Sequence, residues 1–141
     1  MNLFISLKAA LLAMQAVTDL VGGTNSETVR IWNSWQRVNG PGSEPCIIMD
    51  VDREDQQNDL GGSGDLVVAD VTVTCRGRTH DESDALCEAV KSNGGSGGLA
   101  GYHGAFDAIL DDVVHSETPK NDGSEKYWYD HVMTFTMLWN E

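Results

Sequence analysis

The C-terminal stretch Tyr127–Trp139 constrains the fold more than any other, because two kinds of side chain alternate along its whole length. One alternate set carries most of the aromatic and methionine bulk: Tyr127, Tyr129, His131, Met133, Phe135, Met137 and Trp139. The residues between them mix threonine and aspartate with Trp128, Val132 and Leu138. Because successive strand side chains point to opposite faces, this period of two predicts a β-strand with its bulkier face in a core. Such a long strand needs paired neighbours, since an isolated hairpin is only marginally stable in water.

Four other segments have the composition of these neighbours. Val67–Arg76 alternates in the same way and predicts a second long strand near the centre of the sheet. Val29–Trp32 and Cys46–Val51 predict two shorter strands, because β-branched and apolar residues fit a pleated, half-buried surface. Phe106–Val114, with apolar residues at alternating positions in its first half, predicts one more strand.

Two segments predict helices instead. Leu3–Val21 places apolar residues at steps of three and four, which is one face of a helix. Its Lys8 lies inside the apolar run, and no charged region precedes the run, so we interpret it as a helix of the mature protein that packs on its own sheet. The second helix begins with a capping box formed by Thr79 and Glu82 and ends near Asn93.

The predicted order is therefore α-β-β-β-α-β-β within one α+β domain, residues 1–141. The most economical arrangement is a single mostly antiparallel sheet with both helices packed on one face. On this arrangement we expect Val71 and Val73 of one long strand, and Met133 and Phe135 of the other, to be buried on the helix-facing side.

Composition excludes several classes of partner. The formal net charge of −13 argues against binding to nucleic-acid backbone or to anionic membranes, both of which attract Lys and Arg. No run of about 18 apolar residues predicts a membrane span. Three Cys, an odd number without tight spacing, predict neither a disulfide framework nor a zinc site and suit a reducing cytoplasm.

Residues 52–64 form a long polar stretch that predicts an acidic loop between two strands. Asp52, Glu54, Asp55 and Asp59 are its candidate functional residues. Their spacing does not fit the calcium-binding loop of EF-hands, because the required Gly and the closing Glu are absent from their positions. Three interpretations stay open: a solvated loop, an acidic surface used by a partner, and a weak divalent-cation site.

No motif predicts catalysis. The four histidines, His80, His103, His115 and His131, have no local catalytic signature around them. There is no nucleophile elbow, no phosphate-binding loop and no dinucleotide fingerprint. The sequence therefore predicts neither an enzyme nor a resident cofactor or metal.

The chain resembles the tail-completion, or tail-terminator, family of tailed phages, and the resemblance extends over nearly its whole length. The segments that carry it, in order, are residues 7–12, 17–21, 29–33, 45–48, 71–75, 84–90, 101–104 and 138–141. Family members have no catalytic motif, so no active-site residue carries over.

The resemblance implies a structural role in the virion. Such proteins are assembled in the host cytoplasm and form a ring, usually a hexamer, on the head-proximal end of the tail tube. The partners implied are other copies of the chain, the tail tube protein and a head connector or adaptor, with DNA passing through the lumen without specific binding. On this view the acidic residues 52–64 face the lumen or the tube. Two alternatives remain: a head–tail adaptor or tube subunit of the same virion, and an acidic module that binds a cation or a basic protein.

Overall fold

The computed structural model describes residues 2–33, 44–59, 62–119 and 126–140, and within these the side chains of residues 53, 56–59 and 62–65 are not described. The elements, in chain order, are α1 (Leu3–Leu12), α2 (Gln15–Val21), β1 (Ile31–Asn33), β2 (Cys46–Asp59), β3 (Gly62–Gly77), α3 (His80–Ser92), the short 3₁₀ turn η2 (Asn93–Gly95), β4 (Asp107–Pro119) and β5 (Tyr127–Asn140).

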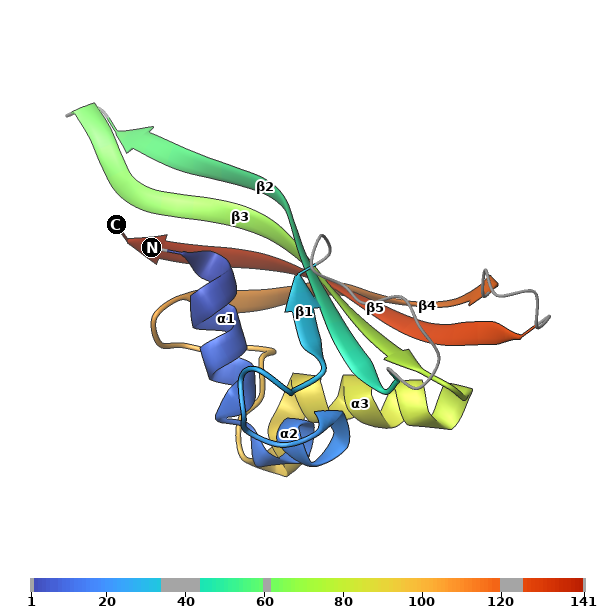
Figure 1. Cartoon of the computed structure of the whole chain (residues 1–141). Helices are drawn as coiled ribbons and strands as arrows, with labels where there is room; N and C mark the ends of the chain where they lie inside the picture. The colour runs from blue at the N-terminus through green and yellow to red at the C-terminus, as the bar shows by residue number, and fades with distance from the viewer. Residues whose placement is uncertain (1, 34–43, 60–61, 120–125, 141) are drawn as a thin grey trace.

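The described strands form one mixed sheet in the order β1-β2-β3-β5-β4. Only β1 and β2 run parallel, and every other neighbouring pair is antiparallel. The predicted α+β class and the central place of β3 are confirmed. The helices lie together on one side of the sheet, as Figure 1 shows, but there are three of them instead of the predicted two.

The extra helix arises because the predicted helix Leu3–Val21 is divided into α1 and α2, which meet at 94°. No Pro or Gly stands at the junction, where Met14 is extended and caps α2. The bend comes from packing: it lets Leu7 of α1 and Val17 of α2, both fully buried, face the same core. Among the described residues no single helix is long and apolar enough to cross a membrane, and α1 with α2 passes that test only as a bent pair.

The two predicted ends of α3 are confirmed by their hydrogen bonds. The Thr79 side chain accepts from the backbone N–H of Glu82 at 3.1 Å, which satisfies one of the free donors of the first turn. Asn93 adopts the left-handed conformation at the C-cap, with φ of 49°. Its side-chain oxygen also accepts from the N–H of Ala16, so the end of α3 is tied to α2.

The core lies between the helices and the middle of the sheet. Val71 pairs across strands with Phe135, and Val73 pairs with Met133. All four side chains are fully buried, as the alternation predicts. On the other face of β3 and β5, which no described helix covers, the threonines are only partly buried.

The sheet extends beyond the helices at both ends (Figure 1). The β2–β3 arm consists of residues 56–59 and 62–66, and the β4–β5 arm consists of Asp112–Pro119 with the facing Tyr127–Thr134. The two arms project in opposite directions from the helix-covered body. Residues 112–115 of β4 are all exposed, so this part of β4 has solvent on both faces.

Candidate functional site

The acidic residues lie on a strand, so the predicted loop at 52–64 is wrong. Asp52, Glu54, Asp55 and Asp59 belong to β2, and the hairpin continues into β3 from Gly62, while residues 60 and 61 lie outside the described part. The stretch was not recognised as a strand because it is polar throughout and shows no alternation. Pairing with β3 overrides this weak local preference, and register shifts at two points along β2 obscure the period further.

These acidic residues belong to a strand that forms an open edge of the sheet. β1 pairs with β2 only as far as Met49, and among the described residues no strand covers β2 beyond that point. Charged side chains on an edge strand discourage unwanted pairing with other chains. Glu54 is exposed, and the Asp52 carboxylate accepts a hydrogen bond from the Thr72 hydroxyl at 2.5 Å. The structure therefore spreads the acidic residues along an edge and does not gather them around a point.

The opposite edge of the sheet, β4, exposes large apolar side chains between its acidic residues. On β4, Ile109 is 53% exposed, Val114 is 52% exposed and Val113 is 37% exposed. Ile109 and Val114 lie on the face without helices, whereas Val113 lies on the helix side but beyond the reach of the core. We call these three residues the β4 apolar residues. The turn before β4 occupies the outer N–H and carbonyl of Ala108, through Tyr102 and Gly101. Beyond Ala108, no strand in the described part of the chain pairs with the outer side of β4, so this length of the edge is open to a partner.

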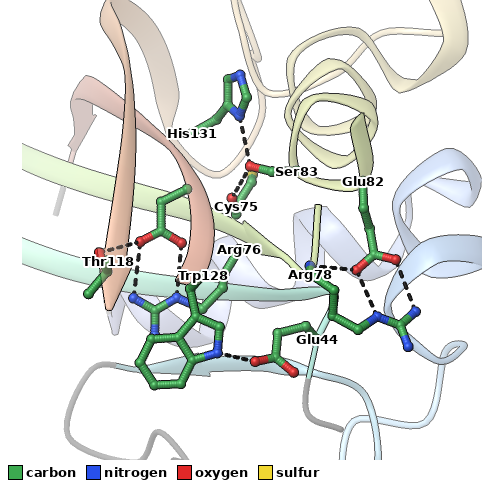
Figure 2. Close-up of polar contacts among 10 residues, drawn as sticks. Glu44, Cys75, Arg76, Arg78, Glu82, Ser83, Thr118, Trp128 and His131 are labelled. Carbon is green, nitrogen blue, oxygen red and sulfur yellow. Dashed lines mark hydrogen bonds and ion pairs between the residues drawn. The ribbon is translucent and has the colours of Figure 1, made fainter. Parts of the chain in front are cut away.

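A buried charge pair anchors the base of the β4–β5 arm. Arg76 of β3 donates to Asp130 of β5 through Nε at 2.9 Å and through Nη2 at 3.1 Å. Figure 2 shows the guanidinium beside the Trp128 ring, whose centroid lies 4.3 Å from Cζ. The Trp128 indole N–H donates to Glu44, and the Thr118 hydroxyl donates to Asp130 at 3.3 Å. This cluster joins β3, β4 and β5 on the face that the helices leave open.

Three of the four histidines meet on the helix-facing side of the same arm. His115 of β4 and His131 of β5 are direct cross-strand partners, and His80 is the first residue of α3. The His80 and His115 ring centroids are 4.5 Å apart, and each lies 5.1 Å from that of His131. One ring nitrogen from each histidine lies within 4.8 Å of the other two. His103 is not part of this group: it lies in the turn before β4 and contacts Asp107.

The orientation of His131 is set by Ser83 of α3. The Ser83 hydroxyl donates to the backbone carbonyl of Cys75 at 2.8 Å, and the same oxygen lies 2.7 Å from His131 Nδ1, as Figure 2 shows. Because a hydroxyl has one hydrogen, Ser83 must accept from His131, which places the ring proton on Nδ1. The other nitrogen, Nε2, lies 3.6 Å from Asp84 Oδ1. Burial lowers the pKa of His131 and so favours the neutral ring.

The sequence interpretation missed this cluster for a physical reason. The alternation of Ala108 and Leu110 in β4 places even-numbered residues on the core face, which would turn His115 away from His131. A register shift between Leu110 and Asp112 reverses the phase, because one extra residue moves every later side chain to the other face. The pairing of His115 with His131 could have been predicted only from the register of the β4–β5 hairpin, by matching β4 residues to β5 residues outward from the turn.

The three cysteines are free and buried. Burial raises the pKa of the Cys46 thiol to about 12 and that of the Cys87 thiol to about 11. The thiolate is the nucleophilic form, so these side chains are packing groups rather than reactive ones.

No protein-family model matches the chain, and no curated protein matches it.

Proposed function

We propose that this protein is a structural subunit of a tailed-phage virion that forms a ring on the head-proximal end of the tail tube, ends tube polymerisation and presents the tail for joining to the head. The sequence resemblance supports this role, and the α+β fold with one sheet agrees with it. The observation that carries the proposal is the exposure of the β4 apolar residues along an unpaired strand edge.

An open apolar edge strand in a single chain is an aggregation hazard unless another chain covers it. The two long edges of this sheet are unlike, since β4 exposes three large apolar side chains and the outer half of β2 has none, although both edges also carry acidic residues. A contact between two unlike surfaces is heterologous, and when its rotation closes it generates a ring. We infer that the β4 edge of one copy adds to a different surface of the next copy.

The acidic edge of β2 then has a separate task in the ring. Asp52, Glu54, Asp55 and Asp59 would face the lumen or the tail tube, as the resemblance implies. In a chain with a net charge of −13, an acidic lumen repels DNA phosphates and lets the genome pass without adhesion. This role needs no ordered binding site, which agrees with the way the carboxylates are spread along an edge.

The test compares two variants with the same change in charge. Val114→Lys places a cation on the β4 edge, and Ile5→Lys places one on α1, where Ile5 is 68% exposed. Sedimentation velocity and negative-stain imaging measure the oligomer of each purified protein, alone and with tail tubes of the same virus. We expect rings and capped tubes from the unchanged chain and from Ile5→Lys, and monomers with uncapped tubes from Val114→Lys.

Two results would count against this role. A chain that stays monomeric at high concentration and with tubes does not form a terminator ring. Rings that bind heads but do not cap tubes would instead indicate a head–tail adaptor, and incorporation along the whole tube would indicate a tube subunit.

A further inference from the structure

We propose that His80, His115 and His131, with Asp84, bind a divalent transition-metal ion, most readily Zn²⁺, that links α3 to the β4–β5 arm. Among the described residues these histidines are the one group of three or more ligand-type side chains close enough to share an ion. The inference rests on this local geometry and does not depend on the assembly role proposed above.

The three rings lie close enough for one nitrogen of each to share an ion. Their facing nitrogens lie within 4.8 Å of one another, and the rings are inclined at 88°, 44° and 46°, so they do not form a parallel stack. Zinc–nitrogen bonds of ~2.0–2.1 Å in a tetrahedral site place ligand nitrogens ~3.3 Å apart. Closing the gap requires small side-chain rotations, and His80 and His115 are both exposed and free to make them.

The hydrogen bond to Ser83 prepares His131 as a ligand. It holds the ring proton on Nδ1 and leaves the Nε2 lone pair available on the side of Asp84. A metal-binding histidine characteristically donates its second N–H to an oxygen, which fixes both the tautomer and the orientation of the ring. Here the oxygen is itself held in place by its bond to the Cys75 carbonyl.

Asp84 lies where it could provide a fourth ligand. Its Oδ1 lies 3.6 Å from Nε2 of His131, so a carboxylate faces a lone pair that carries no proton in this tautomer. The Asp84 side chain is 55% exposed, so water screens this contact, and a cation bound near both atoms would be attracted to each of them. A metal ion bound by the three imidazoles would be such a cation and would take Asp84 as its fourth ligand.

The ligand set selects the kind of ion. Imidazole nitrogens suit Zn²⁺, Cu²⁺, Ni²⁺ and Co²⁺, whereas Mg²⁺ and Ca²⁺ require oxygen ligands. One electrostatic effect opposes metal binding: His80 lies at the N-terminus of α3, where the helix dipole is positive and repels a cation. Asp81 and Glu82 in the same first turn offset it.

The bound ion would cross-link two parts of the fold. His115 and His131 belong to the two strands of the β4–β5 arm, and His80 and Asp84 belong to α3. Their joint coordination would fix the angle between the arm and the helix that packs on β3 and β5.

The test uses tag-free protein, because an affinity tag of histidines would bind the same metals. Protein stripped with a chelator is titrated with Co²⁺, whose visible spectrum reports tetrahedral coordination, and with Zn²⁺ by calorimetry and thermal unfolding. Mg²⁺ serves as the control ion. We expect one Co²⁺ or Zn²⁺ per chain, a melting temperature that rises with Zn²⁺ as ligand linkage requires, and no response to Mg²⁺.

Variants identify the ligands. His80→Gln and His115→Gln change exposed side chains and should leave the metal-free protein folded while weakening Zn²⁺ binding at least ~10-fold, the lower end of the loss seen even for groups that only support a ligand. His103→Gln is the matched control, because His103 is exposed and lies outside the cluster. Absence of metal binding by the unchanged chain, or equal binding by all three variants, would overturn the proposal.

Discussion

Replacing Asp130 by Asn tests how much the Arg76–Asp130 pair contributes to folding. The Arg76 side chain is 10% exposed and the Asp130 side chain is 5% exposed, and two direct hydrogen bonds join them. Asn keeps the shape and one acceptor oxygen but removes the charge, which leaves the guanidinium buried without a counter-ion. Loss of one partner of a buried pair costs ~3–5 kcal/mol. Arg76 keeps its contact with Trp128, so we expect a loss near the lower end of that range.

The measurement is urea unfolding followed by far-ultraviolet circular dichroism, with thermal unfolding as a second reading. For a chain of this size a loss of ~3 kcal/mol lowers the melting temperature by roughly 6–12 °C. The slope of the urea transition should not change, because the folded state buries the same surface.

A double variant separates the charge from the packing. Arg76→Met combined with Asp130→Leu removes both charges and fills similar volume, and such replacements are often neutral or stabilising. We therefore expect the double variant to be more stable than Asp130→Asn alone. A loss below ~0.5 kcal/mol for Asp130→Asn would place the pair in the range of solvent-screened surface pairs and refute the reasoning.

Three further predictions concern the body of the protein. The hydrogen bond from Arg78 lowers the pKa of Glu82 from its usual 4.5. Ionised Glu82 therefore stabilises the fold above pH 4.5, and this contribution is lost as the pH falls through the lowered pKa. In Glu82→Gln the free energy of unfolding should depend less on pH across that range. Val73→Asp should cost several kcal/mol in urea unfolding, since it buries an unpaired charge, and an unchanged transition would mean that the core face is assigned wrongly. All three thiols should react with a thiol reagent in denaturant but slowly in the folded protein, because burial raises the pKa values of Cys46 and Cys87.

The sequence predicts those parts of the fold where one face of an element is buried and the other is not. The alternation of β5 from His131 to Trp139 and the capping residue Thr79 are examples, because burial and hydrogen bonding there follow from a local pattern. The strand character of residues 52–59 was not predictable in this way, since both faces carry polar residues and only the pairing with β3 orders them.

The site residues were harder to predict than the fold. The histidine cluster depends on a one-residue bulge in β4 and on a helix that begins far from β5 in the chain. The alternation places Asp130 on the face opposite His131, which is correct, but its buried partner Arg76 follows only from the register of β3 with β5. Contacts of this kind are set by tertiary pairing, which periodicity does not reveal.

The opposite directions of the two arms have a mechanical consequence. β3 runs into the body from one arm, β5 runs into it from the other, and the two strands lie side by side over Leu66–Gly77 and Tyr129–Asn140. Backbone hydrogen bonds in an antiparallel pair are perpendicular to the strands. A pull that drew the arm tips apart along the strands would load these bonds together, in shear, rather than break them one after another. The paired strands β3 and β5 can therefore transmit a pulling force from one arm to the other.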